Sequence, residues 1–162
     1  MGRFIRTTVA TLVVAWLGLL LASMIAALTR RSGAHVPDES SDELDIVTVY
    51  DQLDFTSRAT DLRRGTVELW FGGGTVDLRG ATLAPGGATI TTRSVFGGGA
   101  LVVPDDWNVT TRIVGIGGAG DGRPKIERSP DAPHLTLDGF VLFGGWGVVS
   151  RPPQEETALP AD

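Results

Sequence analysis

Short runs of glycine, each placed directly after a large apolar residue, constrain the fold of this chain more than any other feature. The runs follow Phe71, Phe96, Ile116 and Phe143. Counted from Tyr50, an aromatic residue without glycine, the spacings are 21, 25, 20 and 27 residues. Nineteen of the 22 glycines lie between Gly65 and Gly147. A recurrence of about 23 residues is typical of stacked repeats, in which each unit buries its apolar face against its neighbours.

The segments between the glycine runs have the pattern of strands. Apolar and polar residues alternate with period two in 66–71, in 75–79 and in 134–137. Turn residues rich in proline, glycine and aspartate separate these segments. The pattern predicts an all-β domain, a single-sheet β-helix or solenoid of about four to five coils over residues 44–149.

The recurring apolar residues and glycines are interpreted as the corners of the coils. We expect the large side chains to stack as a ladder in the core, with the glycines turning the chain where a Cβ would clash or where φ is positive. The predicted structural corners are Phe71, Gly72, Gly73, Phe96, Gly97, Gly98, Ile116, Gly117, Phe143 and Gly144.

The N-terminal region has a different composition. Residues 7–29 contain no charged side chain, and as a helix they would span about 34 Å, enough for a hydrocarbon core of about 30 Å. The run is longer than the apolar part of a signal peptide and ends at Arg30 and Arg31. It predicts one uncleaved transmembrane helix and a single-pass protein of the cell membrane. The charges flanking the run lean only slightly toward an extracytoplasmic main domain.

The predicted organisation has four parts. They are a membrane anchor at 1–31, an acidic tether at 32–43, the β-solenoid domain at 44–149 and a disordered tail at 150–162. All 19 acidic residues but only 12 of the 14 basic residues lie beyond residue 29, so this part carries a net charge of −7. The acidic balance argues against binding of nucleic acid.

Composition also argues against catalysis and against bound cofactors. The chain has no cysteine and only two histidines, His35 and His134, so thiolate chemistry and histidine-rich metal sites are excluded. The glycine runs lead into strands, whereas a phosphate-binding loop leads into a helix. Asp105 and Asp106 follow a proline in a predicted turn, with no identifiable partner base. We therefore expect no enzyme, no cofactor and no metal.

Three tryptophans are candidate contact residues. Trp70 and Trp146 adjoin glycine corners, and Trp107 follows the turn at 104–106. If Phe71 points inward, its neighbour Trp70 points outward, because successive strand residues face opposite sides. An exposed tryptophan is a frequent anchor of protein interfaces, although lateral cover of the solenoid is an equally good interpretation.

Several short elements recur in a recognisable order. A strand enters Phe-Gly-Gly and is followed by Val-Asp-Leu-Arg (Val76 to Arg79) and Ala81, by a second Phe-Gly-Gly, and by Val-Pro-Asp-Asp-Trp-x-Val ending at Val109. A closing Leu-x-Leu-x-Gly-Phe-x-Leu-Phe-Gly-Gly runs from Leu135 to Gly145. This order resembles the C-terminal domain of the LiaF-like family of cell-wall-active-antibiotic response proteins, which is related to the domains called toastrack.

The resemblance covers nearly all of the predicted solenoid domain. It implies a β-helix-like fold and a membrane-associated role in sensing or damping envelope stress, often beside a histidine kinase. It offers no catalytic residues. The chain departs from the family in two ways: LiaF-like proteins commonly have several transmembrane helices, whereas one is predicted here, and Ile116 replaces the usual phenylalanine.

These observations lead to one main functional hypothesis and two alternatives. The main one is a non-enzymatic, membrane-anchored module that acts by protein–protein contacts with a histidine kinase or another envelope protein. The first alternative is a scaffold that assembles with itself, because solenoid ends without caps expose edges that can pair. The second is a lipid- or glycan-binding envelope domain.

Overall fold

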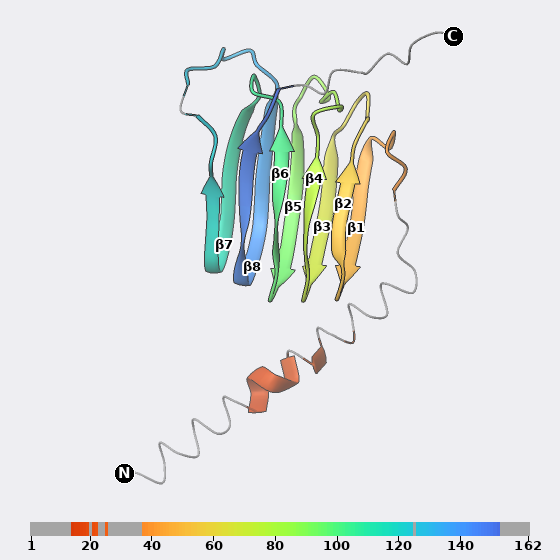
Figure 1. The fold of residues 1–162 in the computed structure, drawn as a ribbon, viewed down its shortest axis with the longest axis vertical. Coiled ribbons are helices and arrows are strands. Elements are labelled where there is room, and N and C mark those ends of the chain that lie inside the picture. Colours follow the sequence, from red (N-terminus) through yellow and green to blue (C-terminus); the bar gives the residue numbers. More distant parts are fainter. Residues whose placement is uncertain (1–13, 20, 23–24, 26–36, 125, 153–162) are drawn as a thin grey trace, which may run out of the picture. The chain divides into compact units, whose positions relative to one another are not determined.

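The computed structural model describes residues 14–19, 21–22, 25, 37–124 and 126–152. The chain divides into two compact units, Met1–Ala34 and His35–Asp162. The described residues of the first unit are helical, and the second unit is built from strands (Figure 1).

The predicted N-terminal transmembrane helix requires correction. Among the residues described, no helix is long and apolar enough to cross a membrane. A crossing takes about 20 consecutive helical residues, whereas the helical residues described are 14–19, 21–22 and 25. The remainder of the predicted span at 7–29 lies outside the described residues, as do residues 32–36 of the predicted tether and 153–162 of the predicted tail.

The strands of the described part form one sheet (Figure 1). They are β1 (Glu43–Val49), β2 (Gln52–Thr56), β3 (Arg64–Trp70), β4 (Gly73–Asp77), β5 (Ala88–Val95), β6 (Gly98–Val103), β7 (Asn108–Asp121) and β8 (His134–Ser150). Their order is β1-β3-β5-β8-β6-β4-β2, with β7 added on β8. All of these pairings are parallel. The prediction of an all-β, solenoid-like domain is confirmed.

Each coil of the solenoid has two arms that meet at a corner. β1, β3 and β5 form one arm of the first three coils, and β2, β4 and β6 form the other. The long strand β8 supplies both arms of its coil, because its first part pairs with β5 and its second part with β6. β8 thereby lies between the β5–β6 coil and β7, although β7 precedes it in the chain. β7 consequently ends the stack.

The core lies between the two arms. Along β5, buried and half-buried residues alternate, as expected for a strand with one face toward a core. Equivalent inward positions of successive coils stack on one another, for example Gly65, Ile90 and Leu137 on one arm and Val76, Leu101 and Val148 on the other. Gly99 leaves room for the ring of Trp146, since a Cβ at Gly99 would lie 2.9 Å from it. The indole Nε1 of Trp146 donates a hydrogen bond to the buried Ser94 hydroxyl (2.8 Å).

Candidate functional site

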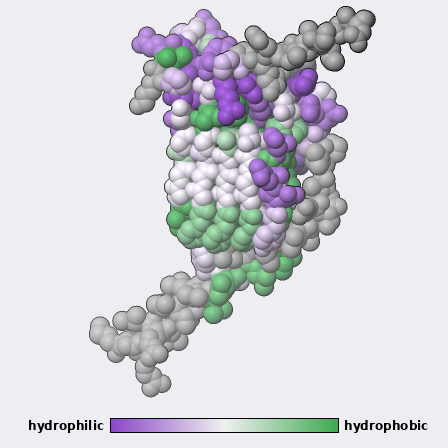
Figure 2. All heavy atoms as spheres, viewed as in Figure 1, coloured by the Kyte–Doolittle hydropathy of each residue, from purple (hydrophilic) through white to green (hydrophobic). Residues whose placement is uncertain are grey.

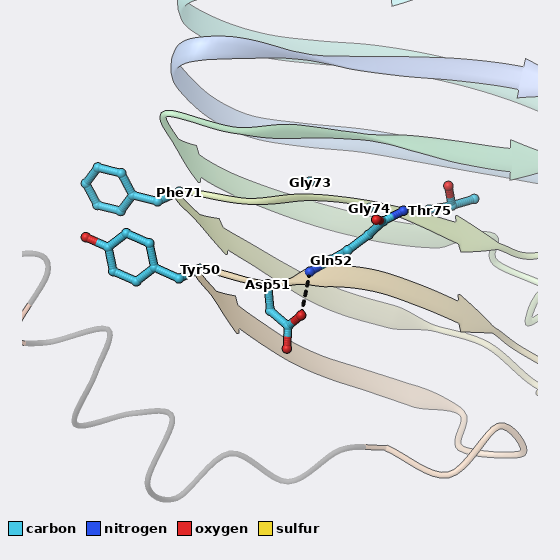
Figure 3. A pocket seen from close by; sticks show the side chains of 7 residues that line it. All are labelled: Tyr50, Asp51, Gln52, Phe71, Gly73, Gly74 and Thr75. Carbon is cyan, nitrogen blue, oxygen red and sulfur yellow. Dashed lines mark hydrogen bonds between the residues drawn. The ribbon is translucent and has the colours of Figure 1, made fainter.

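Four aromatic residues occupy the corners of successive coils. Tyr50, Phe71, Phe96 and Phe143 have φ of 54°, 56°, 51° and 59°. Their rings stack with centroids 4.9, 5.4 and 4.9 Å apart. Figure 3 shows the rings of Tyr50 and Phe71 projecting outward from the turn. The prediction of an inward ladder is therefore wrong: Phe96 is 42% and Phe143 is 41% exposed.

The glycine after each aromatic residue lies too close to the neighbouring coil for a side chain to fit. A Cβ at Gly72 would lie 2.2 Å from the carbonyl oxygen of Asp51, at Gly97 2.1 Å from that of Gly72, and at Gly144 1.7 Å from that of Gly97. None of these three glycines has positive φ. The aromatic residue itself adopts the left-handed conformation, and the next residue has to lack a side chain because the coils approach closely there.

The second glycines of the corners serve the same close approach. A Cβ at Gly98 would lie 1.9 Å from the carbonyl oxygen of Gly145. At Gly73 the nearest atom, the carbonyl oxygen of Gly98, would be 3.3 Å away, so this position is only tight. The predicted glycine corners thus lie where coils stack, although the reason for glycine differs from the predicted one.

The corner of β7 has a different construction. Ile116 pairs with Leu142 and Gly117 with Gly144, so the register shifts and β7 has no residue opposite Phe143. Ile116 is 58% exposed and is not a rung of the aromatic stack. Its assignment as an equivalent corner residue is corrected. Here the glycine does need positive φ, because Gly117 has a φ of 144°.

Two of the three candidate contact tryptophans are buried. Trp107 is 4% and Trp146 is 2% exposed, so neither presents a ring to a partner. Both belong to the hydrophobic core. Trp70 is half-buried, and its indole Nε1 lies 3.4 Å from a carboxylate oxygen of Glu68. Neither an exposed contact residue nor lateral cover describes Trp107 and Trp146, which are core residues.

Sequence reasoning missed a repeated Asp-x-Arg motif that closes two of the coils. Arg79 donates to the Asp77 carboxylate through its backbone N–H, Nε and Nη2, and Arg123 makes the same three bonds to Asp121. Arg123 also donates to the carbonyl oxygens of Trp107 and Val109. The recurrence of Asp-x-Arg at strand ends is the signal that could have found these residues.

The Asp-x-Arg pairs hold both carboxylates ionised. Burial on its own raises the pKa of Asp77, but the hydrogen bonds and charge of Arg79 outweigh it and keep this pKa below 3.8. The hydrogen bond from Arg123 is the chief reason that the pKa of Asp121 is also lowered. In each pair, the aspartate at the end of a strand binds the arginine two residues later in the turn that follows. This local contact indicates a structural role.

A shallow hollow lies beside the aromatic corner (Figure 3). Its volume is about 500 Å³, and its lining includes Tyr50, Phe71, Gln52 and Thr75. The Asp51 carboxylate at its rim accepts a hydrogen bond from the backbone N–H of Gln52 (2.8 Å). Among the described residues, no three His, Asp or Glu side chains are placed to hold a metal ion.

The open edge of β7 is the most distinctive surface of the domain. In the part of the chain that the structure describes, β7 pairs with β8 and with no other strand. Val114 is 69% and Ile116 is 58% exposed on it. A Cβ at Gly118 or Gly120 would meet no atom within 4 Å. Figure 2 shows apolar residues gathered along the side of the solenoid on which the corners of the coils lie.

The opposite end of the stack has a charged edge. β1 and β2 form it, and Glu43, Asp45 and Asp54 are exposed there. Carboxylates on an edge strand oppose pairing with another chain, because pairing would dehydrate them. β7 has no carboxylate from Asn108 to Gly120. The two ends thus differ in how well they are protected against added strands.

Comparisons of the chain with protein families, with curated proteins and with solved structures gave no match. The resemblance to LiaF-like proteins stays a prediction.

Proposed function

We propose that the solenoid domain is a non-enzymatic protein-interaction module that binds by adding a strand of another polypeptide to the open edge of β7. The observation that carries this proposal is the contrast between a 14-residue, glycine-rich strand with no carboxylate from Asn108 to Gly120 and the carboxylate-bearing edge at the other end. Native domains protect exposed edges with charge, proline or a bulge. From Asn108 to Gly120, β7 has only one charged residue, Arg112, no proline and one register shift, at Ile116/Gly117, so most of its edge stays open to pairing.

The backbone of β7 suits strand addition. The outer N–H and C=O groups of an edge strand are ready partners for an extended segment, and the exposed side chains then add specificity. Val114 and Ile116 supply apolar surface before and at the corner. The glycines beyond the corner have no side chains that would hold a partner's backbone away. An incoming strand would thus gain main-chain hydrogen bonds and apolar contacts together.

The resemblance to LiaF-like proteins supports a particular class of partner, a histidine kinase or another envelope protein. The binding of a lipid or glycan stays a prediction of the sequence. A sugar usually stacks on the open face of an aromatic ring, whereas Phe71 and Phe96 lie between stacked neighbours on both sides. The edge of β7 is the better supported surface.

Photo-crosslinking in cells tests the proposal. The full chain carries a photoreactive phenylalanine analogue at Val114, on the open edge, or as a control at Ile126, which is 56% exposed outside the strands. We expect discrete protein adducts from position 114 and none from position 126. Equal labelling at both positions, or no adduct at position 114, contradicts an interaction through β7.

A further inference from the structure

We propose that the strand added to β7 is the β7 of a second copy of this chain, in antiparallel orientation about a two-fold axis close to Ile116. This inference rests on the proposed function and names its partner. The solenoid becomes a closed dimer, in which the two copies join through their β7 ends. Dimers with two-fold symmetry are the commonest oligomers, and their interfaces are self-complementary.

Charge argues against the alternative of head-to-tail stacking of β7 on β1 and β2. If the parallel register continued into a second copy, Glu43 would lie level with Thr110 and Asp54 with Gly120. Neither carboxylate would gain a cation, and both would lose water. Only Asp45 would be matched, by Arg112. Glu43 is already paired with Arg64 (2.6 Å), but Asp54 would be buried beside Gly120 without a cation. Burying such a carboxylate is costly, so this mode is disfavoured.

Pairing of two β7 strands avoids this cost. Between Asn108 and Gly120 the strand carries a single charge, that of Arg112. In an antiparallel register centred on Ile116, Arg112 lies opposite Gly120 of the second copy, so the two arginines are at opposite ends of the paired region. No like charges face each other.

In the same register, core-side residues of one β7 lie opposite core-side residues of the other, and outer residues lie opposite outer residues. Ile113 and Ala119 pair with Gly139 and Trp146 of β8 and belong to the core side. The antiparallel register sets Ile113 opposite Ala119 of the second copy, which places apolar residues together at the open end of both cores. On the outer side, Val114 meets Gly118. The pairing therefore closes the ends of two hydrophobic cores at once.

The inward Thr111 supplies an independent observation. Its hydroxyl is buried and has no hydrogen-bond partner among the described residues. In the antiparallel register Thr111 lies opposite Asp121 of the second copy, whose carboxylate accepts further hydrogen bonds beside those from Arg123. The dimer would satisfy a polar group that the isolated solenoid leaves unpaired.

The altered corner of β7 permits the close approach of two strands. In the other coils an aromatic ring projects from the corner, but β7 omits this residue and has Gly117 there. Ile116 then lies near the two-fold axis, where it meets its own copy. The missing ring and the shifted register are features that a capping partner at this corner would require.

Disulfide trapping gives a direct test, because the chain has no native cysteine. Ile116→Cys places two thiols face to face at the proposed axis, and Ile126→Cys is the matched control, since the two isoleucines are 58% and 56% exposed. With dissolved oxygen and a copper catalyst as oxidant, two thiols lose two electrons and two protons to form one disulfide. We expect the purified full chain with Ile116→Cys to form covalent dimers at least about tenfold faster than the control, since paired strands hold the thiols at high effective concentration.

A charge substitution tests the same contact without oxidation. Ile116→Asp sets two carboxylates against each other at the axis, and Ile126→Asp adds the same charge elsewhere. In sedimentation at micromolar concentration, we expect Ile116→Asp to lose the dimer and Ile126→Asp to keep it. Equal circular dichroism spectra of both variants show that the fold is intact. Association through any other part of the chain would not separate this pair of variants.

The outcomes that overturn the inference are distinct. A monomeric full chain, or equal trapping at positions 116 and 126, rules out the second copy. Assembly beyond the dimer without trapping at position 116 establishes head-to-tail stacking and also overturns it. If the chain is monomeric while position 114 still crosslinks a different protein in cells, the second copy is excluded and the proposed function stands. If the chain is monomeric and position 114 crosslinks no protein, both the second-copy inference and the proposed function are wrong.

Discussion

The two ends of the solenoid are built from strands of the same length and opposite chemistry. Residues 43–56, with β1, the corner and β2, and residues 108–121 of β7 each contribute 14 residues to one coil. The first end carries exposed carboxylates and an aromatic corner, and the second has neither between Asn108 and Gly120. A repeat can thus keep its parallel strand pairing while its side chains decide whether an end is closed or open to pairing.

The largest effect is expected from glycine substitutions that contrast an inner corner with the open edge. A Cβ at Gly144 would lie 1.7 Å from the carbonyl oxygen of Gly97, whereas one at Gly118 meets no atom within 4 Å. We expect Gly144→Ala to lower the free energy of unfolding by about 3 kcal/mol or more. Gly118→Ala should change it by less than about 0.5 kcal/mol. Urea unfolding measures both, and equal losses would show that the coils are not closely packed at Gly144.

The aromatic corner is expected to give the next largest effect. Phe96 stacks between Phe71 and Phe143, so Phe96→Ala should cost about 2–3 kcal/mol of unfolding free energy. Because φ at this position is 51°, Phe96→Gly should be more stable than Phe96→Ala by about 1 kcal/mol. Thermal unfolding of the two variants is the measurement. A more stable alanine variant would contradict the left-handed conformation at this corner.

The Asp-x-Arg pairs predict a difference in acid stability between an inner coil and β7. Both carboxyl pKa values are lowered in the folded protein, so the pairs stabilise it above pH 3.8 and lose this contribution as the pH falls through the folded values. The Asp77 side chain is 11% exposed, and we expect Asp77→Asn to cost roughly 2 kcal/mol at pH 7. Asp121 is 39% exposed in the single chain, so Asp121→Asn should cost about 0.5 kcal/mol when both substitutions are made in the Ile116→Asp background, which we expect to be monomeric.

Unfolding free energies measured from pH 7 down to pH 2.5 check this order. Each variant should show a flatter decline with falling pH than the parent chain, and the flattening should be greater for Asp77→Asn. The reverse order in the monomeric background would contradict the greater burial of Asp77.

The smallest effect on stability is expected from removing the charged protection of the first end. Asp45→Thr with Asp54→Thr should alter the unfolding free energy by less than about 0.5 kcal/mol, because both side chains are exposed. It should nevertheless allow β1 and β2 to accept a strand, so that association continues past the dimer. Light scattering follows this growth. A double variant that associates no further than the parent would show that these carboxylates do not protect the edge.

Much of the fold could be predicted from local patterns. The period-two alternation at 66–71 and the recurrence of glycine were enough for an all-β stack, because burial of one strand face and the close approach of coils leave a direct mark on residue type. The role of the glycines was harder to predict. A glycine required by positive φ and one required by a neighbouring carbonyl oxygen look the same in a sequence, and Gly97 proved to be the second kind.

The candidate surface was less predictable. Ile116 occupies a position of the repeat that suits a corner residue, and the shift in register opposite Phe143 appears only when β7 is aligned beside β8. The burial of Trp107 and Trp146 likewise depends on coils far away in the chain. The predicted transmembrane helix was not supported by the described residues, and a count of apolar residues could not reveal this.

The sequence by itself determined that this protein has a repetitive β domain, that corners lie at Phe71, Phe96 and Phe143, and that the residue at 116 differs from these. These properties are local, since they depend on alternation and on the residues adjacent to each turn. Only the tertiary structure decided that β8 inserts ahead of β7 and leaves β7 at the end of the stack. The order of coils is set by long-range strand pairing, and the same repeat is compatible with more than one order.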